Sequence, residues 1–456
     1  MKDIFDYVDN HQDDAVDLVR RLCHQPSISA QNIGLTDMAQ LLADMMEDVG
    51  IKTQILPTSG GPPVVYGELK GNSPYTLMFY DHYDVQPPEP LELWKSVPFE
   101  PVVKDGRIWG RGVADNKGNI AARLAAIKAF LKVRGSLPVS LKFCVEGDEE
   151  IGSPHLEAFV KAQRSLLQAD GCIWEGAGVN WGGQPQVILG CKGILYVELA
   201  VRTANSDVHS SLATIVPNPA WRLVRILSSL KDANERVLIP GFYDDVVPPS
   251  QRDLTALDSL PLEDEDLKKN LGLKDLVLGL KGRDYLVRHL FQPTCNICGI
   301  VSGYNGEGSK TVLPAEARVK IDFRLVPRQT PEDIMAKLKA HLSRQGFDDV
   351  TLATPMEGER PGRTPIDSPF VQAVAKAAEG IYSQKPAVTP TMAATGPMYC
   401  FTDILGQPVA GVGVENPDSR AHAPNENIRL EDLARGTKHI AAIMDGVAAL
   451  GKDRRP

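Results

Sequence analysis

The chain of 456 residues is too long to fold around one hydrophobic core, so we expect at least two domains. Hydrophobic residues make up 43% of it and charged residues 23%, which is typical of a globular protein that does not enter a membrane. The net charge of −9 and the lack of a basic block, apart from a short tail at 452–455, exclude nucleic acid as a partner.

The sequence predicts no export signal. Residues 1–20 are acidic and lack the basic start and apolar run of a secretory signal, and no run of about 18 apolar residues could span a membrane. The seven cysteines are an odd number and lie in apolar segments, so we expect a reduced, cytoplasmic protein. Cys295 and Cys298 form a single CxxC pair without a second pair, which does not predict a zinc or redox site.

The first part of the chain alternates strand and helix patterns. We predict helices at 2–22, 36–48, 117–134 and 155–167, and strands at 64–70, 76–81, 140–145 and 171–174. A glycine-rich segment at 106–118 matches no phosphate-binding motif. Strands run repeatedly into a polar tip and then into a helix, so the fold class is α/β with a mostly parallel sheet.

The pattern changes after residue 192. We predict strands at 194–202, 294–301, 312–325 and 349–353 and helices at 219–230 and 331–345, with a charged, irregular insertion at 240–290. This strand–helix–strand–strand–helix–strand order predicts an α+β, ferredoxin-like unit. From about 358 the α/β pattern returns, with helices at 368–383 and 430–450 and a strand at 408–412. The expected domains are therefore 1–192 and 358–456 for catalysis, with 193–357 inserted as a dimerisation and lid domain.

Acidic residues and histidines gather at the predicted strand ends. His82 and Asp84 lie two positions apart at the end of a strand and would share one face. The other candidates are Asp115, Glu149, Glu150, Glu175 and His422. Carboxylates and imidazoles together are typical ligands of borderline divalent metals. The alternative for each residue taken singly is an ordinary solvated loop charge or a surface histidine.

The roles divide by position. A two-metal site needs a bridging carboxylate, and Asp115, preceded by glycines, is the residue we expect there. Of the neighbouring acids Glu149 and Glu150, one can bind metal while the other holds and deprotonates a water. Asp84 beside His82 would fix the imidazole tautomer.

In combination, these segments resemble metallopeptidase family 20, which includes carnosinases and non-specific dipeptidases, glutamate carboxypeptidases, aminoacylases and succinyl-diaminopimelate desuccinylases. The matching motifs are DHYDVQP (81–87), GRGVADNKG (110–118), EGDEEIGS (146–153), DVHS (207–210) and SRAHAPNE (419–426). The resemblance covers essentially the whole chain.

The resemblance implies a role for each residue. His82 and Glu175 would hold one metal, Glu150 and His422 the other, and Asp115 would bridge both, next to a peptide bond to Asn116 that is typically cis. Glu149 would be the general base and Asp84 would orient His82. His209 would reach the active site of a partner subunit and polarise the scissile carbonyl. Arg324 would meet the substrate's carboxylate.

Three features bear on which branch of the family this chain resembles. The loop 394–398, which contains Gly396 as a substrate contact, departs from the Gly-Ser-Ile-Pro type segment of the family's dipeptidases. The residue at position 175 is Glu, as in the carboxypeptidases and deacylases, whereas dipeptidases tend to have Asp. The length and the 240–290 insertion instead favour the dipeptidase branch.

We therefore expect a homodimeric hydrolase with two divalent metal ions per subunit, Zn²⁺ first and Mn²⁺ or Co²⁺ as alternatives. It would cleave the amide bond of dipeptides or small peptides; the alternatives are a carboxypeptidase and an N-acyl-amino-acid deacylase. A remoter alternative is a metal-free binding protein on the same fold. A serine or cysteine hydrolase is disfavoured because there is no GxSxG motif and Cys144 lies within a strand pattern.

Overall fold

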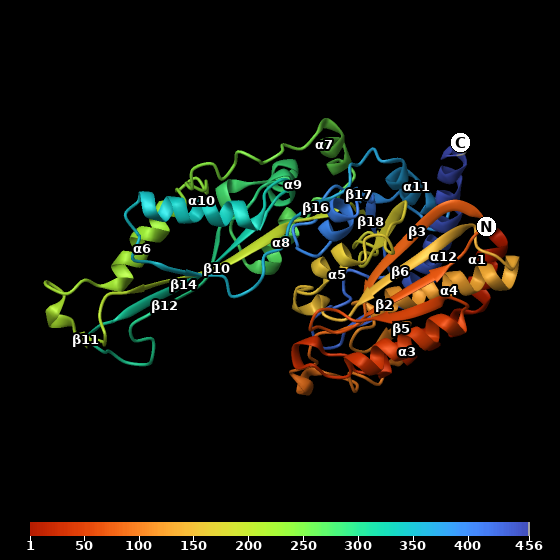
Figure 1. Ribbon diagram of the computed structural model, residues 1–456, viewed down its shortest axis with the longest axis horizontal. Coiled ribbons are helices and arrows are strands. Elements are labelled where there is room, and N and C mark those ends of the chain that lie inside the picture. The colour runs from red at the N-terminus through yellow and green to blue at the C-terminus, as the bar shows by residue number, and fades with distance from the viewer. Residues whose placement is uncertain (455–456) are drawn as a thin grey trace.

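The computed structural model describes residues 1–454 and shows two parts arranged along one long axis (Figure 1). The helices are α1 (Lys2–Asn10), α2 (Gln12–His24), α3 (Leu35–Asp48), α4 (Lys117–Arg134), α5 (Leu156–Ala162), α6 (Pro219–Leu230), α7 (Gln251–Leu257), α8 (Asp264–Leu271), α9 (Gly282–Phe291), α10 (Pro331–Arg344), α11 (Pro369–Ala377) and α12 (Leu430–Ala448).

The larger part is built on an eight-stranded sheet. Its strands, in spatial order, are β1 (Lys52–Leu56), β2 (Val64–Leu69), β6 (Val139–Glu146), β3 (Ser73–His82), β7 (Gly171–Trp174), β18 (Val409–Gly411), β8 (Gln186–Ile188) and β17 (Ala387–Thr389). The four central strands β6, β3, β7 and β18 run parallel, and β1–β2–β6 and β18–β8 are antiparallel. The expected α/β class with a mostly parallel sheet is confirmed.

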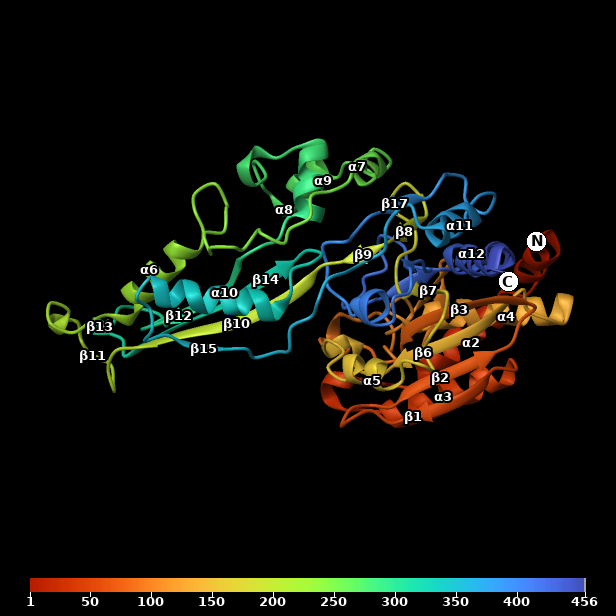
Figure 2. The same cartoon turned by 45° about the horizontal axis from the view of Figure 1, so that its top comes forward.

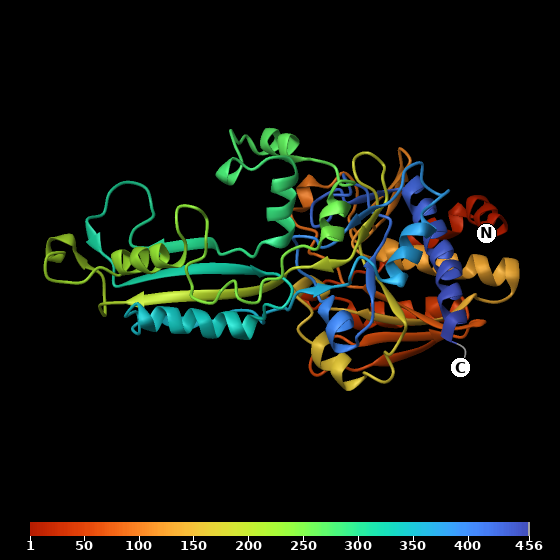
Figure 3. The same ribbon diagram turned by 90° about the horizontal axis from the view of Figure 1, so that it is seen from above.

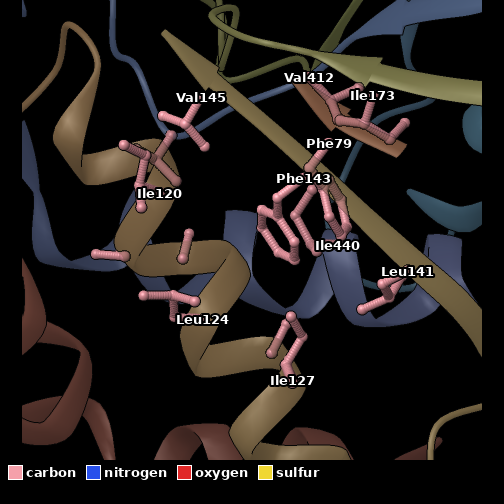
Figure 4. Close-up of a cluster of buried hydrophobic side chains, with 14 of the residues drawn as sticks. Phe79, Ile120, Leu124, Ile127, Leu141, Phe143, Val145, Ile173, Val412 and Ile440 are labelled. Carbon is pink, nitrogen blue, oxygen red and sulfur yellow. The ribbon is translucent and has the colours of Figure 1, made fainter. Parts of the chain in front are cut away.

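Helices cover both faces of this sheet because side chains of each central strand alternate between two cores. Phe79 and Phe143, with ring centroids 5.1 Å apart, face α4 and α12 together with Ile120, Leu124, Ile127 and Ile440 (Figure 4). Tyr80 and Cys144, one position further along, face the opposite core under α5. Burial on both sides fixes the register of β3 and β6, and so the position of the polar residues that follow them.

The smaller part is a four-stranded antiparallel sheet with the order β12 (Asn296–Ser302), β14 (Glu316–Leu325), β10 (Gly193–Arg202) and β15 (Thr351–Ala353). Helices α6 and α10 cover one face, where the odd-numbered residues of β10 and β14 form the core. The connectivity β10–α6–β12–β14–α10–β15 is the ferredoxin-like order that we expected. Figure 2 shows this unit extending away from the larger part.

The segment 240–290 is not irregular, and the prediction for it was wrong. It contains α7, α8 and α9, which lie above the junction of the two parts (Figure 3). These helices have only 7, 8 and 10 residues, so each carries too few apolar positions to show a helical period. A capping box between Ser250 and Asp253 starts α7, and Leu257, Leu286 and Phe291 form a small core of their own.

Several helix boundaries also differ from the prediction. The segment 2–22 forms two helices that meet at His11, α5 ends at Ala162, and α11 ends at Ala377. Short two-stranded and three-stranded sheets complete the fold: β11 (Val208–His209) with β13 (Val312–Leu313), β9 (Gly190–Cys191) with β16 (Gly362–Arg363), and β4 (Val102–Lys104), β5 (Arg107–Trp109) and β19 (Asn427–Arg429). Within residues 1–454, we find no helix long and apolar enough to cross a membrane.

Candidate functional site

The candidate residues meet where the parallel strands end. His82 is the last residue of β3, the Glu149–Glu150 pair follows β6 in the short helix η3 (Glu149–Ile151), and Glu175 follows β7 directly. His422 lies in the loop after β18. Since the carboxyl ends of parallel strands share one sheet edge, residues more than 300 positions apart are brought together.

One group of possible ligands surrounds His82. Its Nε2 lies 3.0 Å from Oδ1 of Asp115 and 3.4 Å from Oε2 of Glu175. His82, Glu149 and Glu175 each offer a ligand atom within 4.8 Å of the others. The imidazole is 1% exposed, so its position is set by packing as well as by these contacts.

A second group surrounds His422. Its Nε2 lies 3.0 Å from Oδ2 of Asp115 and 3.0 Å from Oε2 of Glu150. Asp115 therefore directs one oxygen to His82 and the other to His422. This single carboxylate joins the two groups, which is the arrangement expected of a bridging ligand.

Asp84 contacts His82 and the Glu149–Glu150 turn. Its Oδ1 is 3.3 Å from Nδ1 of His82, so Nε2 of that ring is left for a ligand role. The same carboxylate accepts the backbone N–H groups of Glu149 at 3.2 Å and Glu150 at 3.0 Å. One buried side chain thus sets the orientation of His82 and the conformation of the Glu149–Glu150 turn.

The Asp115 loop is held by Glu426, which belongs to the motif at 419–426 and for which no role was predicted. Glu426 accepts the backbone N–H groups of Gly112, Ala114 and Asp115 at 2.8–3.0 Å and a hydrogen bond from Arg111 at 2.7 Å. Gly112 has φ of +83°, a conformation that favours glycine. The peptide bond between Asp115 and Asn116 is cis, as the family resemblance implies.

A second set of supporting contacts lies behind Glu175. Asn116 donates to Oε2 of Glu175 at 3.2 Å and to Asp81 at 3.2 Å. Asp81 in turn forms a buried ion pair with Arg123 of α4. In the sequence, only the proximity of Asn116, Asp81 and Arg123 to the motifs could have indicated their supporting roles. An Arg within an apolar helix pattern does not by itself predict a site.

The electrostatics of the site favour bound cations. Burial raises the pKa of Glu149 to about 8. The positive charge of His82 opposes this shift, and the negative charge of Asp115 adds to it. Hydrogen bonds to Asp115 and Glu150 raise the pKa of His422 to about 10. Four carboxylates and two imidazoles share this space. Two divalent cations would balance the four negative charges, and nitrogen and oxygen donors of this kind suit zinc-like ions.

His209 and Arg324 lie outside this cluster, on the smaller part. His209 is exposed in β11, and both Figure 1 and Figure 2 place that strand at the end of the molecule away from the larger sheet. The backbone N–H of Ser211 donates to Nδ1 of His209 at 3.1 Å, which leaves Nε2–H free to donate. Arg324 donates to Oγ1 of Thr395 at 2.5 Å, next to Gly396.

Residues 78–446 match the family described as peptidase family M20/M25/M40. The chain belongs to this family. It is therefore a hydrolase, and the family predicted from the motifs is confirmed.

Relatives with assigned names match this chain over nearly its whole length. It is 28% identical to the "Beta-Ala-His dipeptidase" of Rattus norvegicus, over 97% of this chain and 94% of the relative. It is 28% identical to the "Cys-Gly metallodipeptidase dug1" of Schizosaccharomyces pombe, over 98% of both chains. Among solved structures, the M20 family metallo-carboxypeptidase Sso-CP2 from Sulfolobus solfataricus has a TM-score of 0.88 and 39% identity, over 95% of this chain and 99% of that one.

Proposed function

We propose that this M20 peptidase is a metal-dependent dipeptidase that uses two divalent ions per subunit. The observation that carries the proposal is the placement of Asp115, whose two oxygens each lie 3.0 Å from a different histidine. His82, Glu175 and Asp115 would hold one ion, and Glu150, His422 and Asp115 the other. When bound, the ions would supply Lewis-acid polarisation of the scissile carbonyl and lower the pKa of the attacking water. Zn²⁺ is the ion proposed, with Mn²⁺ and Co²⁺ compatible with the same donors.

Glu149 is proposed as the general base. It is next to Glu150 in sequence, but its carboxylate lies with His82 and Glu175, whereas that of Glu150 lies with Asp115 and His422. The hydrogen bond from its backbone N–H to Asp84 fixes the turn that carries it. Glu149 would take a proton from the attacking water and deliver it to the leaving amine nitrogen.

His209 is proposed to complete the active site of a second copy of the chain. Its position at the tip of the smaller part supports action between subunits, and its free Nε2–H is suited to stabilise the developing oxyanion. Strand β12 supports the homodimer: it is an edge strand whose Ile297, Ile300 and Val301 are 46%, 54% and 63% exposed. An uncovered apolar edge strand is suited to pairing with another chain.

Arg324 is proposed to hold the α-carboxylate of the substrate, with Gly396 forming the adjacent wall. A Cβ at position 396 would stand 2.9 Å from the ring of Trp174, the residue before Glu175, so the loop passes close to the metal ligands. A guanidinium binds a carboxylate with two parallel hydrogen bonds, which a lysine ammonium does not reproduce.

A carboxypeptidase is the second candidate, because the Sulfolobus neighbour at 39% identity is named as one. Both functions require a free carboxylate at Arg324 and differ in how much peptide extends past the other side of the scissile bond. We also propose the boundaries 1–192, 193–357 and 358–456 for the domains. A cytoplasmic location is supported by the seven free thiols of the described cysteines.

The test is a substrate panel with metal-stripped and metal-reconstituted protein. We expect hydrolysis of a dipeptide to need added metal and its C-terminal amide to react roughly 10–150-fold more slowly, because one charge-assisted contact is lost. Arg324→Lys should slow the acid and leave the amide little changed. Equal rates for acid and amide would contradict the role of Arg324, and cleavage of longer peptides would favour the carboxypeptidase.

A further inference from the structure

Ile194, at the start of β10, pairs with a positively charged residue on one side and a negatively charged residue on the other. Arg324 of β14 is its cross-strand partner on one side. On the other, Ile194 and Glu359 exchange two backbone hydrogen bonds, at 2.9 and 3.0 Å. Directly paired residues of antiparallel strands point to the same face. The side chains of Arg324, Ile194 and Glu359 therefore line the face of the sheet opposite α6 and α10.

The carboxylate of Glu359 lacks the partner that its burial calls for. Its Oε2 is buried and has no hydrogen-bond partner within the described part of the chain. The nearest cation in sequence, Arg360, pairs instead with Glu332 at 3.3 Å. Burial raises the pKa of Glu359 to about 7, and Arg324 opposes this shift. A buried acid without a partner is costly unless something else supplies the hydrogen bond.

The position of this carboxylate connects it to the reaction site. A Cβ at Gly152 would stand 3.6 Å from Oε1 of Glu359. Gly152 directly follows η3, the turn that carries Glu149 and Glu150. Glu359 thus lies between the end of that turn on one side and Arg324 on the other, about 10 Å from Arg324 between Cα atoms, since two strand spacings separate them.

We propose that Glu359 is a specificity site for a positively charged group of the substrate, the ammonium or guanidinium of a basic residue at its carboxyl end. The proposal rests on the proposed function, in which Arg324 holds the α-carboxylate of that residue. A substrate residue bound between the two charged side chains would present its carboxylate to Arg324 and its basic side chain to Glu359. The substrate's own N-terminus is a second source of an ammonium near the site. The experiment distinguishes the two sources by acetylating the N-terminus.

The experiment compares four substrates on the zinc-loaded protein: Ala-Lys, Ala-norleucine, and the N-acetylated form of each. Norleucine has the lysine side chain without the amino group. We expect kcat/KM for lysine to exceed that for norleucine by roughly 10-fold or more, the worth of a charge-assisted contact, with either N-terminus. Glu359→Gln should bring that ratio close to one. The matched control is Glu357→Gln, which removes an exposed carboxylate two positions earlier and should keep the ratio.

Each outcome has one reading. The proposal is overturned if Glu359→Gln leaves the ratio of kcat/KM for lysine to that for norleucine unchanged. It is also overturned if Glu359→Gln changes only the ratio of kcat/KM for the free substrate to that for its N-acetylated form, which would assign Glu359 to the N-terminal ammonium. If none of the four is hydrolysed, the proposed function fails, and calorimetry still decides this inference. Wild-type protein should then bind L-lysine more tightly than L-norleucine by a factor that Glu359→Gln abolishes, and equal affinities would overturn it.

Discussion

Glu426 accepts a hydrogen bond from the backbone N–H of Asp115 at 3.0 Å, across 311 positions of sequence. Its other oxygen binds the N–H of Gly112 and the guanidinium of Arg111. The buried side chain of Glu426 therefore shapes the loop that presents the proposed bridging ligand.

The first prediction concerns this support. Glu426→Gln keeps the shape but replaces an acceptor oxygen with an NH₂ donor, which faces N–H groups and repels them. We expect metal affinity to fall about 10–100-fold, the usual effect of losing a support behind metal ligands. Competition with a chelating dye measures it. Glu431→Gln, an exposed change near the start of α12, is the control and should bind metal like the wild type.

The second prediction concerns the base. Glu149→Gln should retain both metal ions and lose about 10²–10⁴-fold in turnover, because the amide cannot accept the proton. Metal analysis and steady-state kinetics on the same preparation measure the two effects. A variant with wild-type turnover would remove Glu149 from the mechanism, and one that loses an ion would make it a ligand.

The third prediction tests action between subunits. His209→Ala should lower turnover without changing metal content, because the exposed ring lies at the tip of the smaller part. A heterodimer of His209→Ala with Glu149→Gln should regain activity, since one of its two sites then has both a base and a histidine. A purified heterodimer as inactive as its parents would show that His209 acts within its own chain or not at all.

The fourth prediction is a pH dependence of stability. Burial in α12 lowers the pKa of His439 to about 4, from an ordinary value of 6.5. Between these values the unfolded chain binds a proton that the folded chain does not, so this group makes stability rise with pH across that window. Its share between pH 5 and 7 is about 2 kcal/mol.

His439→Gln should therefore lose less stability than wild type when the pH falls from 7 to 5. Denaturant midpoints at the two pH values measure the difference. His24→Gln, at an exposed position, is the control and should follow the wild-type slope. Parallel slopes for wild type and His439→Gln would contradict the assignment.

Much of the fold could be predicted because its elements have strong local patterns. The helix expected at 117–134 is α4 to the residue, and the strand at 171–174 is β7. Ligand candidates such as His82 and Glu175 could be found because several carboxylates and imidazoles follow predicted strands, whose carboxyl ends share one edge of a parallel sheet. The insertion at 240–290 was predicted, but its helices were not, because α7, α8 and α9 are too short to show a helical period.

The supporting residues could not be assigned from the sequence for a different reason. Asp81 and Arg123 pair across α4 and β3, and Glu426 reaches back to the Asp115 loop, through contacts that no local pattern encodes. Glu359 could not be recognised as a site residue, since its relation to Arg324 depends on the register of β10 with β14 and on an isolated bridge to Ile194. Tertiary contacts of this kind become visible only once the chain is folded.

The central claim is that Asp115 joins two metal sites. Crystals of the zinc-loaded protein, with data collected at the zinc absorption edge, test it in one anomalous difference map. We expect two peaks per chain, about 3.5–4 Å apart and on either side of the Asp115 carboxylate, as in other two-metal sites. A single peak, or peaks that do not contact Asp115, would contradict it.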